Sequence, residues 1–273
     1  MMERNRGTRE APQKTGGAGL DLPAITLQGF RFAAATETRC VAAILAELAE
    51  RRGGWVITPN LDILRQAASS KEVAGMLREA DLLVPDGMPL VWASWLQGTP
   101  VPERVAGSHL VGSLSRGCAR EGRSVFLLGG SEGAAEAAAE VLRQRNPRLD
   151  VRGTHCPAFG FEKDAAAMEA MRAQLRASGA DVVFVALGFP KQERLIRELR
   201  AELPEAWWLG VGISFSYLAG DVAQAPGWMQ QLGLEWVHRL SQEPKRLAER
   251  YLVHDLPFAF RLLGDAARAR RRK

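Results

Sequence analysis

Cysteine is scarce in this 273-residue sequence, and the few cysteines are scattered. They are Cys40, Cys118 and Cys156. No CxxC pair and no close pair of histidines accompanies them. An odd and dispersed set is not typical of a disulfide framework or of a structural zinc site. We therefore expect a globular chain that is stabilised by neither.

Long hydrophobic runs are missing as well. No apolar run reaches the roughly 18–20 residues that a membrane-spanning helix needs. The opening MMERNRGTREAPQKTGGAGL is polar and rich in glycine, and it lacks the apolar stretch of a secretory signal. We expect residues 1–22 to form a disordered tail and the protein to stay in the cytoplasm.

Motifs for metal-assisted and nicotinamide-dependent chemistry are also absent. The sequence has no DxD, no HExxH and no cluster of histidines and aspartates, so we expect no metal site. GVGISF supplies two glycines of a dinucleotide fingerprint, but Phe215 stands in place of the third, and we expect no cofactor. Neither Tyr217 nor Tyr251 is followed by a lysine four positions later. These absences disfavour a nucleotide-sugar oxidoreductase or epimerase.

Short apolar runs that alternate with amphipathic stretches are what the sequence does contain. Several runs are apolar almost throughout, which is typical of strands covered on both faces. Helix-like segments such as 132–145 and 164–177 lie between them. Right-handed crossovers then predict an α/β fold, a Rossmann-like and mostly parallel sheet with helices on both faces. The expected strands are 55–58, 81–85, 124–129, 150–154, 181–188 and 206–212, with a small hairpin within 25–36.

The pattern changes after Gly220, where no strand is expected. We predict a catalytic α/β domain over residues 23–220, a C-terminal helical appendage over 221–264 and a basic tail over 265–273. Tryptophans, leucines and arginines alternate in the appendage, as in an interfacial membrane element. The alternative is a helical pair that packs its apolar side on the core. The net charge of the chain is +5. The basic tail is expected either to bind an anionic surface or to be a solvated terminus that binds nothing. We expect no nucleic acid partner.

Four expected strands end in polar or glycine-rich loops, at 58–60, 85–87, 129–131 and 188–190. Ligands of open α/β sheets bind at the carboxyl ends of strands, so these loops should face one crevice. Asp86, in VPDGMPLV, is the sharpest candidate, because a carboxylate there can accept a proton from an acceptor hydroxyl. The alternative for Asp86 is a helix-capping or turn aspartate.

Two other loops carry groups that suit a sugar nucleotide. Thr58 and Asn60 offer a hydroxyl and an amide for sugar hydroxyls, although Asn60 is also a good helix cap. Gly129 and Gly130, in LLGGSEG, resemble a phosphate cradle before a helix, but the loop matches neither the Walker pattern nor GxGxxG. Glu132, which follows in the first helical turn, would oppose a nearby diphosphate.

Six segments occur in the order found in one glycosyltransferase family. They are TPNLDIL, ADLLVPDGMPLV, ERVAGSHLV, VFLLGGSEG, ADVVFVALGFPKQERLI and GLEWVHRLSQEPKRLAERYL. GFPKQE and GLEWVHRLSQEPKR are the most specific of them. From about Leu27 to Leu252 the sequence resembles the WecG/TagA/CpsF glycosyltransferases, which are glycosyltransferase family 26.

The resemblance implies an inverting, metal-independent transferase. Its donor would be a UDP-sugar carrying N-acetylmannosamine, N-acetylmannosaminuronic acid or glucose. Its acceptor would be an undecaprenyl-diphosphate-linked saccharide used in cell-surface polysaccharide biosynthesis. By matching position, Asp86 would be the general base, and Thr58, Asn60 and Gln192 would bind substrate. The residues expected around the nucleotide are Gly129, Gly130, Gly188, Pro190, Lys191 and Glu193.

The resemblance also gives the appendage a role, in which it closes over the site at the cytoplasmic membrane surface. Arg239, Arg246 and Arg250 follow one another at spacings of seven and four, so one helix would place them on one face. Arginine forks suit diphosphate oxygens, and a solvated basic face is the alternative. A homo-oligomer is compatible with the family.

Two positions depart from the family pattern. Ser216 replaces an aspartate common in relatives, and Gln224 replaces an arginine. Because of these departures, the family's contacts to the donor and its donor sugar do not carry over in detail to this sequence. The proposed base, Asp86, is unaffected. The competing function is a non-catalytic, membrane-associated nucleotide-sugar binding protein, which would bind UDP without turnover.

Overall fold

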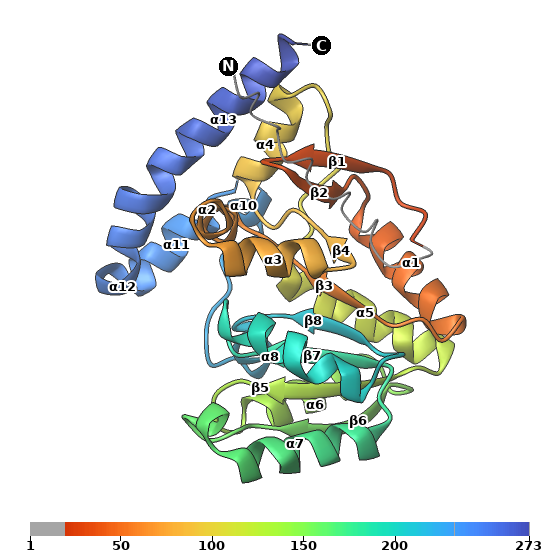
Figure 1. Cartoon of the computed structure of the whole chain (residues 1–273). Coiled ribbons are helices and arrows are strands. Elements are labelled where there is room, and N and C mark those ends of the chain that lie inside the picture. The colour runs from red at the N-terminus through yellow and green to blue at the C-terminus, as the bar shows by residue number, and fades with distance from the viewer. Residues whose placement is uncertain (1–19, 232, 273) are drawn as a thin grey trace, which may run out of the picture.

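A parallel sheet is the centre of the molecule (Figure 1). The computed structural model describes residues 20–231 and 233–272, so most of the expected tail over 1–22 lies outside the described residues. Six strands pair in the order β4-β3-β8-β7-β5-β6, and every pairing is parallel. The strands are β3 (Gly54–Ile57), β4 (Leu82–Leu83), β5 (Ser124–Gly129), β6 (Asp150–His155), β7 (Val182–Ala186) and β8 (Trp207–Gly210).

The expected hairpin is confirmed beside this sheet. It pairs β1 (Ala24–Leu27) with β2 (Phe30–Ala33) in antiparallel register. Phe30 and Phe32 are buried in the hydrophobic core, so the hairpin covers part of the domain. The chain enters its α/β domain through these two strands.

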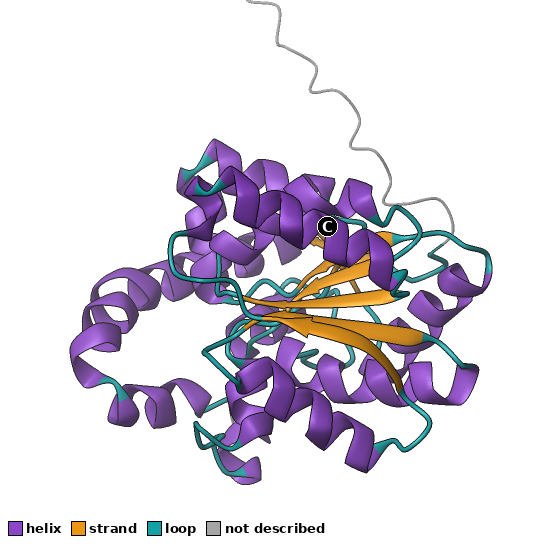
Figure 2. Cartoon of the chain, turned by 90° about the horizontal axis from the view of Figure 1, so that it is seen from below, coloured by secondary structure: helices purple, strands orange, loops and turns teal. Residues whose placement is uncertain are grey.

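Helices cover both faces of the sheet, as Figure 2 shows, and this explains the apolar strands. In β5, Val125 and Leu127 face one buried cluster, whereas Phe126 and Leu128 face the other. The first face is covered by α1 (Glu37–Ala49), α5 (Gly107–Glu121), α6 (Ala134–Arg145) and α9 (Ser214–Ala219). The second is covered by α2 (Leu61–Ser69), α3 (Lys71–Glu79), α4 (Met88–Leu96), α7 (Ala165–Ser178) and α8 (Lys191–Leu199). The predicted α/β class is therefore confirmed.

A series of helices follows α9. They are α10 (Gly227–Gln231), α11 (Glu235–Gln242), α12 (Pro244–Ala248), the π-helix η3 (Glu249–Asp255) and α13 (Leu256–Arg270). Short 3-10 turns η1 (Phe161–Lys163) and η2 (Arg200–Glu202) complete the elements within the described residues. In Figure 1, α11 and α12 lie at the left edge, away from the strands.

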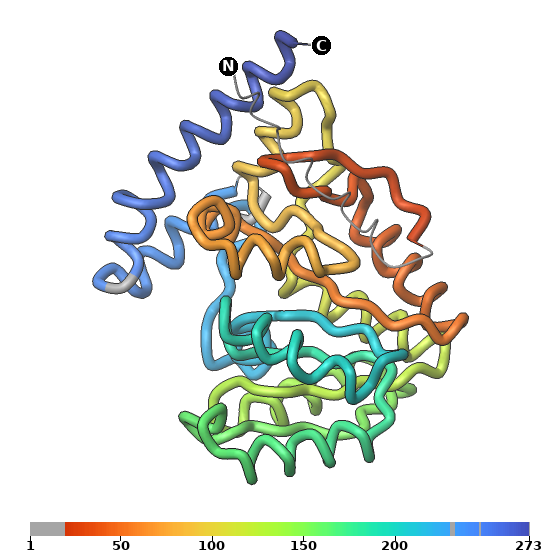
Figure 3. The backbone as a smooth tube through the Cα atoms, in the orientation of Figure 1, coloured from red at the N-terminus to blue at the C-terminus, as the bar shows by residue number. Residues whose placement is uncertain are grey.

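The last helix packs on the domain. Phe258, Leu262 and Ala266 of α13 are buried in the same cluster as α2 and α4. Figure 3 shows α13 running beside α4, a segment far earlier in the chain. The expected boundary after Gly264 falls inside α13, and residues 265–270 continue that helix.

The parallel order decides where ligands can bind. Because all six strands run the same way, the loops after β3, β4, β5 and β7 lie at one edge of the sheet, as predicted.

Among the helices in the described part of the chain, none combines the length and the apolar character needed to cross a membrane.

Candidate active site at the carboxyl edge of the sheet

Asp86 lies in the loop between β4 and α4, at the carboxyl edge. Its backbone N–H donates to the Pro59 carbonyl at 3.0 Å, which joins the loop after β4 to the loop after β3. Gly87 follows with φ +151°, a conformation that side chains rarely adopt. The N-cap of α4 is Gly87, and no side chain caps that helix. The capping alternative for Asp86 on its own helix therefore does not hold.

The Asp86 carboxylate points to a different helix. The N–H of Gly107, the first residue of α5, donates to Asp86 Oδ2 at 3.5 Å. The Asp86 side chain keeps 26% of its exposure, so a ligand can reach it. Burial by its surroundings raises the pKa of this carboxyl, while the Arg104 charge and the Gly107 N–H act in the opposite direction. The result is an accessible carboxylate with increased proton affinity, as a general base needs.

Thr58 and Asn60 lie close to Asp86. Thr58 is buried, and a Cβ on Gly107 would lie 3.0 Å from its Oγ1. Asn60 Oδ1 accepts the Ile63 N–H at 3.0 Å and caps α2, so the alternative considered for Asn60 is confirmed. The structure thus brings Thr58, Asn60 and Asp86 together around the start of α5. It also gives Asn60 a structural task.

Gln192 and Glu193 act inside the fold. Gln192 Oε1 accepts the N–H groups of Gly188 at 3.1 Å and Gly212 at 2.9 Å, and so ties the loop after β7 to the loop after β8. Gln192 Nε2 donates to Glu193 Oε1 at 3.0 Å. The Trp55 indole N–H donates to Glu193 Oε2 at 2.9 Å. Both side chains are buried, and the Glu193 carboxylate faces Trp55 within the fold.

The glycines of the expected phosphate cradle are required by packing. Gly129 and Gly130 have φ of +96° and +91°. The Gly130 N–H donates to the Ala186 carbonyl at 2.6 Å, and a Cβ on Gly130 would lie 3.4 Å from Phe215. The first turn of α6 begins after Gly133 without a side-chain cap. The loop therefore passes close to β7 and α9, whatever it binds.

The loop after β7 turns through Gly188 and a cis Phe189–Pro190 bond into α8. Lys191, at the start of this helix, reaches across to the loop after β6. Its Nζ lies 2.6 Å from Glu162 Oε1 and 4.7 Å from the centroid of the Phe161 ring. Lys191 is thus close to the carboxyl edge but already paired.

The three arginines of the appendage occupy three different elements. Arg239 is in α11, Arg246 is in α12 and Arg250 is in η3. The expectation of one continuous helix is wrong, because the chain leaves the helical conformation at Glu243 (φ −131°, ψ 60°) before Pro244.

Arg239 and Arg250 differ in their surroundings. The Arg239 guanidinium lies 5.8 Å from the Tyr217 ring centroid, and its charge lowers the pKa of Asp86. Arg250 Nη2 instead lies 2.9 Å from Asp62 Oδ2, and its Nε lies 3.6 Å from Asp255 Oδ2. Arg65 contacts the same two aspartates. Arg239 therefore belongs to the Asp86 neighbourhood, whereas Arg250 fastens η3 to α2.

Two comparisons with known proteins identify the family of this chain. The family model "Glycosyl transferase WecG/TagA/CpsF family" matches residues 25–272. The chain belongs to the WecG/TagA/CpsF glycosyltransferase family. One relative, from Bacillus spizizenii, is 32% identical over 199 residues, which are 73% of this chain and 75% of the relative. It is named N-acetylglucosaminyldiphosphoundecaprenol N-acetyl-β-D-mannosaminyltransferase. The chain is thus a glycosyltransferase, an enzyme rather than a binding protein without turnover.

In this WecG/TagA/CpsF protein, two residues near Asp86, Arg104 and Glu235, were not singled out from the sequence. Arg104, in the loop between α4 and α5, lies 3.9 Å from Asp86 Oδ1 and 2.5 Å from Glu235 Oε2. Both occur in motifs that carry the family resemblance, ERVAGSHLV and GLEWVHRL. The motifs could have drawn attention to Arg104 and Glu235. They do not show that the two side chains pair with each other across 131 positions.

Metal ligation has no obvious place among the residues that the structure describes. No group of three or more histidine, cysteine, aspartate or glutamate side chains gathers there in a way that could hold an ion. The charged groups closest to Asp86 are arginines and Glu235.

Proposed function

We propose that the enzyme transfers an N-acetylmannosaminyl group from a UDP donor to an undecaprenyl-diphosphate-linked N-acetylglucosamine, with inversion and without a metal ion. The observation that carries this proposal is the Asp86 carboxylate, which is accessible at the carboxyl edge and has a raised pKa. The acceptor and the sugar follow the name of the Bacillus spizizenii relative. N-acetylmannosaminuronic acid and glucose are the other donor sugars that the assay must compare.

In the proposed reaction, an acceptor hydroxyl attacks the anomeric carbon of the donor sugar. Its oxygen forms the new glycosidic bond while the bond to the UDP phosphate oxygen breaks, which inverts the anomeric centre. Asp86 accepts the hydroxyl proton, and UDP leaves with the bonding electrons. A positioned base of this kind accelerates a reaction by about 10²–10⁴-fold.

The remaining predicted residues take proposed roles that follow their placement. Thr58 and Asn60, beside Asp86, are proposed to bind sugar hydroxyls. Gln192 is proposed to act by holding two loops of the crevice together. The nucleotide would lie along the loops that contain Gly129, Gly130, Gly188, Pro190 and Lys191, with Glu193 supporting them from inside.

Charge on the two diphosphates has to be balanced by cationic side chains, and in our proposal these come from the appendage. Arg239 has the most suitable surroundings, because it neighbours Asp86. Arg246 is proposed on sequence grounds. Arg250 would join them only by exchanging its contacts with Asp62 and Asp255.

We also propose that the enzyme works at the cytoplasmic face of the membrane. Large apolar side chains are exposed on the appendage and on α13 and are available for an interface with lipid. They include Trp228, Trp236, Leu252, Val253, Leu256 and Phe260. The state in which it works, monomer or homo-oligomer, is measured by light scattering in the presence and absence of vesicles.

A donor screen tests the proposed function. UDP release is followed with UDP-N-acetylmannosamine, its uronic acid and UDP-glucose, with detergent-solubilised polyprenyl-diphosphate N-acetylglucosamine and excess EDTA. We expect acceptor-dependent release from the first donor, at a rate that Asp86→Asn lowers by about 10²–10⁴-fold. Loss of wild-type activity in EDTA, restored by a divalent cation, would refute metal independence. Release from another donor would correct the sugar, and equal rates for the variant would remove Asp86 as the base.

A further inference from the structure

Arg104 is shared by two carboxylates that come from different parts of the chain. Its side chain is only 10% exposed. Nη1 lies 2.5 Å from Glu235 Oε2 in α11 and 3.9 Å from Asp86 Oδ1 in the α/β domain. The Arg104–Glu235 contact is a direct charge-assisted hydrogen bond, whereas the distance from Arg104 to Asp86 is too long for one. Glu235 therefore holds the guanidinium, and Asp86 experiences it only at a distance.

Which of the two carboxylates binds Arg104 directly determines how basic Asp86 is. A carboxylate that is directly paired with an arginine has a lowered proton affinity and is a weaker base. If Glu235 lost its charge, Arg104 would have one carboxylate left as a partner. The aliphatic part of the Arg104 side chain has rotatable bonds, and the guanidinium has only a short distance to cover before it pairs directly with Asp86.

We propose that Glu235 is a positioning residue for the reaction: it binds Arg104 and thereby keeps Asp86 free of a direct charge-assisted hydrogen bond from that guanidinium. This inference rests on the proposed function, since it assumes that Asp86 is the base. It goes further because it gives a residue of the helical appendage control over the base of the α/β domain. Glu235 need not touch either substrate for this effect.

Two further groups, besides Arg104 and Glu235, change the pKa of Asp86. Arg239 of α11 lowers the pKa of Asp86, and so does the Gly107 N–H at the start of α5. Glu235 raises it and Arg104 lowers it, while burial makes the largest contribution. Removing the Glu235 charge therefore lowers the pKa of Asp86 twice, through the lost carboxylate and through the released Arg104.

Glu235→Gln is the test, because it removes the charge and keeps the shape. A base must be deprotonated, so kcat/KM falls on the acid side as pH drops through the pKa of Asp86. We expect this acid limb to move to lower pH by about one unit in Glu235→Gln, with a lower plateau at high pH. Glu249→Gln is the matched control, since Glu249 is an appendage glutamate whose side chain is 80% exposed. It should leave the profile unchanged.

A double-variant cycle separates this role from a structural one. In an Arg104→Gln background, Glu235→Gln should shift the limb by much less, because no guanidinium is left to be released. A limb that does not move in Glu235→Gln overturns the proposal, even if the overall rate falls. If the variants are inactive, the Asp86 carboxyl is titrated directly by carbon-13 NMR of aspartate-labelled protein and assigned with Asp86→Asn. An unchanged rate in Asp86→Asn would instead refute the proposed function, which is a separate outcome.

Discussion

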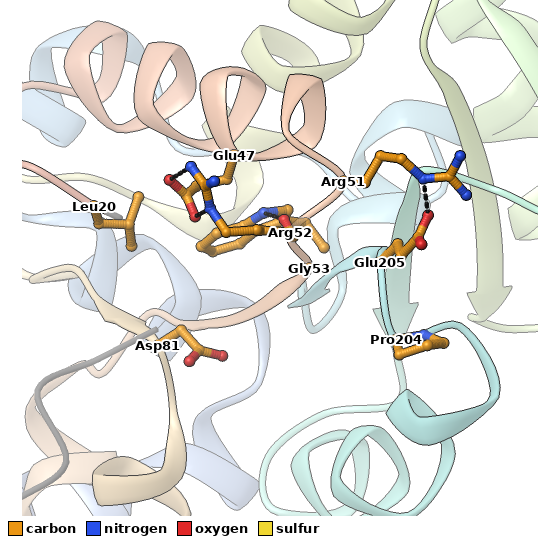
Figure 4. Close-up of a pocket in the computed structure, with 9 residues that line it drawn as sticks. Leu20, Glu47, Arg51, Arg52, Gly53, Asp81, Pro204 and Glu205 are labelled. Atoms are coloured by element: carbon orange, nitrogen blue, oxygen red, sulfur yellow. Dashed lines mark hydrogen bonds and ion pairs between the residues drawn. The ribbon is translucent and has the colours of Figure 1, made fainter. Parts of the chain in front are cut away.

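The two edges of the central sheet contain the same types of charged residue in different arrangements. At the amino edge, Arg51 lies 2.9 Å from Glu205, and the two side chains are 78% and 54% exposed (Figure 4). At the carboxyl edge, Arg104 is 10% exposed and faces both Asp86 and Glu235. Exposed one-to-one pairs are screened by water and contribute little, whereas the largely buried Arg104 lowers the pKa of Asp86.

Figure 4 shows two ion pairs in the hollow at the amino edge, Arg51 with Glu205 and Arg52 with Glu47. Arg52 binds both oxygens of Glu47, at 2.8 and 3.0 Å. Asp81 accepts the backbone N–H of Trp55 at 2.9 Å. The charges of this hollow are used to join α1, β3 and the start of β4. The two edges therefore differ in how deeply their arginines are buried and in which carboxylates face them, rather than in residue type.

The largest expected effect compares the two aspartates that flank β4. Asp86→Asn at the carboxyl edge should lower kcat by about 10²–10⁴-fold, because the amide cannot accept the proton. Asp81→Asn at the amino edge keeps an acceptor oxygen for the Trp55 N–H and should retain kcat. Steady-state kinetics and circular dichroism of both variants check this. Comparable losses in the two would break the comparison.

The next effect concerns two buried glutamates with different partners. Burial raises the pKa of Glu193 to about 7, while hydrogen bonds from Gln192 and Trp55 oppose the shift. A carboxyl whose pKa is higher in the folded state stabilises the fold below its unfolded pKa and loses that contribution as pH rises through about 7. We expect the free energy of unfolding to fall by about 3 kcal/mol from this group over that range.

Glu193→Gln should flatten this pH dependence, as measured by urea unfolding between pH 4.5 and 8. Glu47→Gln is the control at the amino edge. Arg52 would lose its hydrogen-bonded carboxylate there and keep only Glu50, at 3.8 Å, so the variant should lose stability at neutral pH. A profile for Glu193→Gln as steep as that of the wild type would show that Glu193 is not the titrating group.

A smaller effect separates the two arginines. Arg104→Gln removes a positive charge from Asp86, so its pKa rises further and the acid limb of kcat/KM should move to higher pH by about one unit. Arg51→Gln at the amino edge should leave the limb in place. The pH profiles of both variants measure this. A shift in Arg51→Gln, or a downward shift in Arg104→Gln, would contradict the assignment of charges.

The smallest expected effect is on stability at the exposed pair itself. Arg51→Gln should change the free energy of unfolding by no more than about 1 kcal/mol, and high salt should reduce the difference. Thermal unfolding at two ionic strengths measures it. A larger, salt-independent loss would mean that the hollow contributes to the fold more than its exposure indicates.

Sequence reasoning reached the features that depend on local pattern. Apolar runs and crossovers predicted the parallel sheet, and parallel strands place Asp86, Thr58 and Asn60 at one edge. Contacts between distant segments were beyond it. The Trp55–Glu193 hydrogen bond spans 138 positions, and no local pattern indicates which buried donor a carboxylate meets.

The appendage was predicted less well for a related reason. The spacing of Arg239, Arg246 and Arg250 assumed one helix. Pro244 and the π-helix η3 change the direction and periodicity of the chain there. Asp62 and Asp255 then take Arg250 as a partner, a tertiary contact that spacing does not show.

The packing of α13 on α4 has a consequence for how the appendage can move. Phe215 of α9 and Phe258 of α13 are both buried, so the helical segment between them is fixed at both ends. Folding of the chain therefore already includes most of the entropic cost of bringing the middle of this segment, which contains Glu235, to the crevice. Glu235 is therefore present near Arg104 at a high effective concentration in every molecule, without a binding step that dilution could reverse.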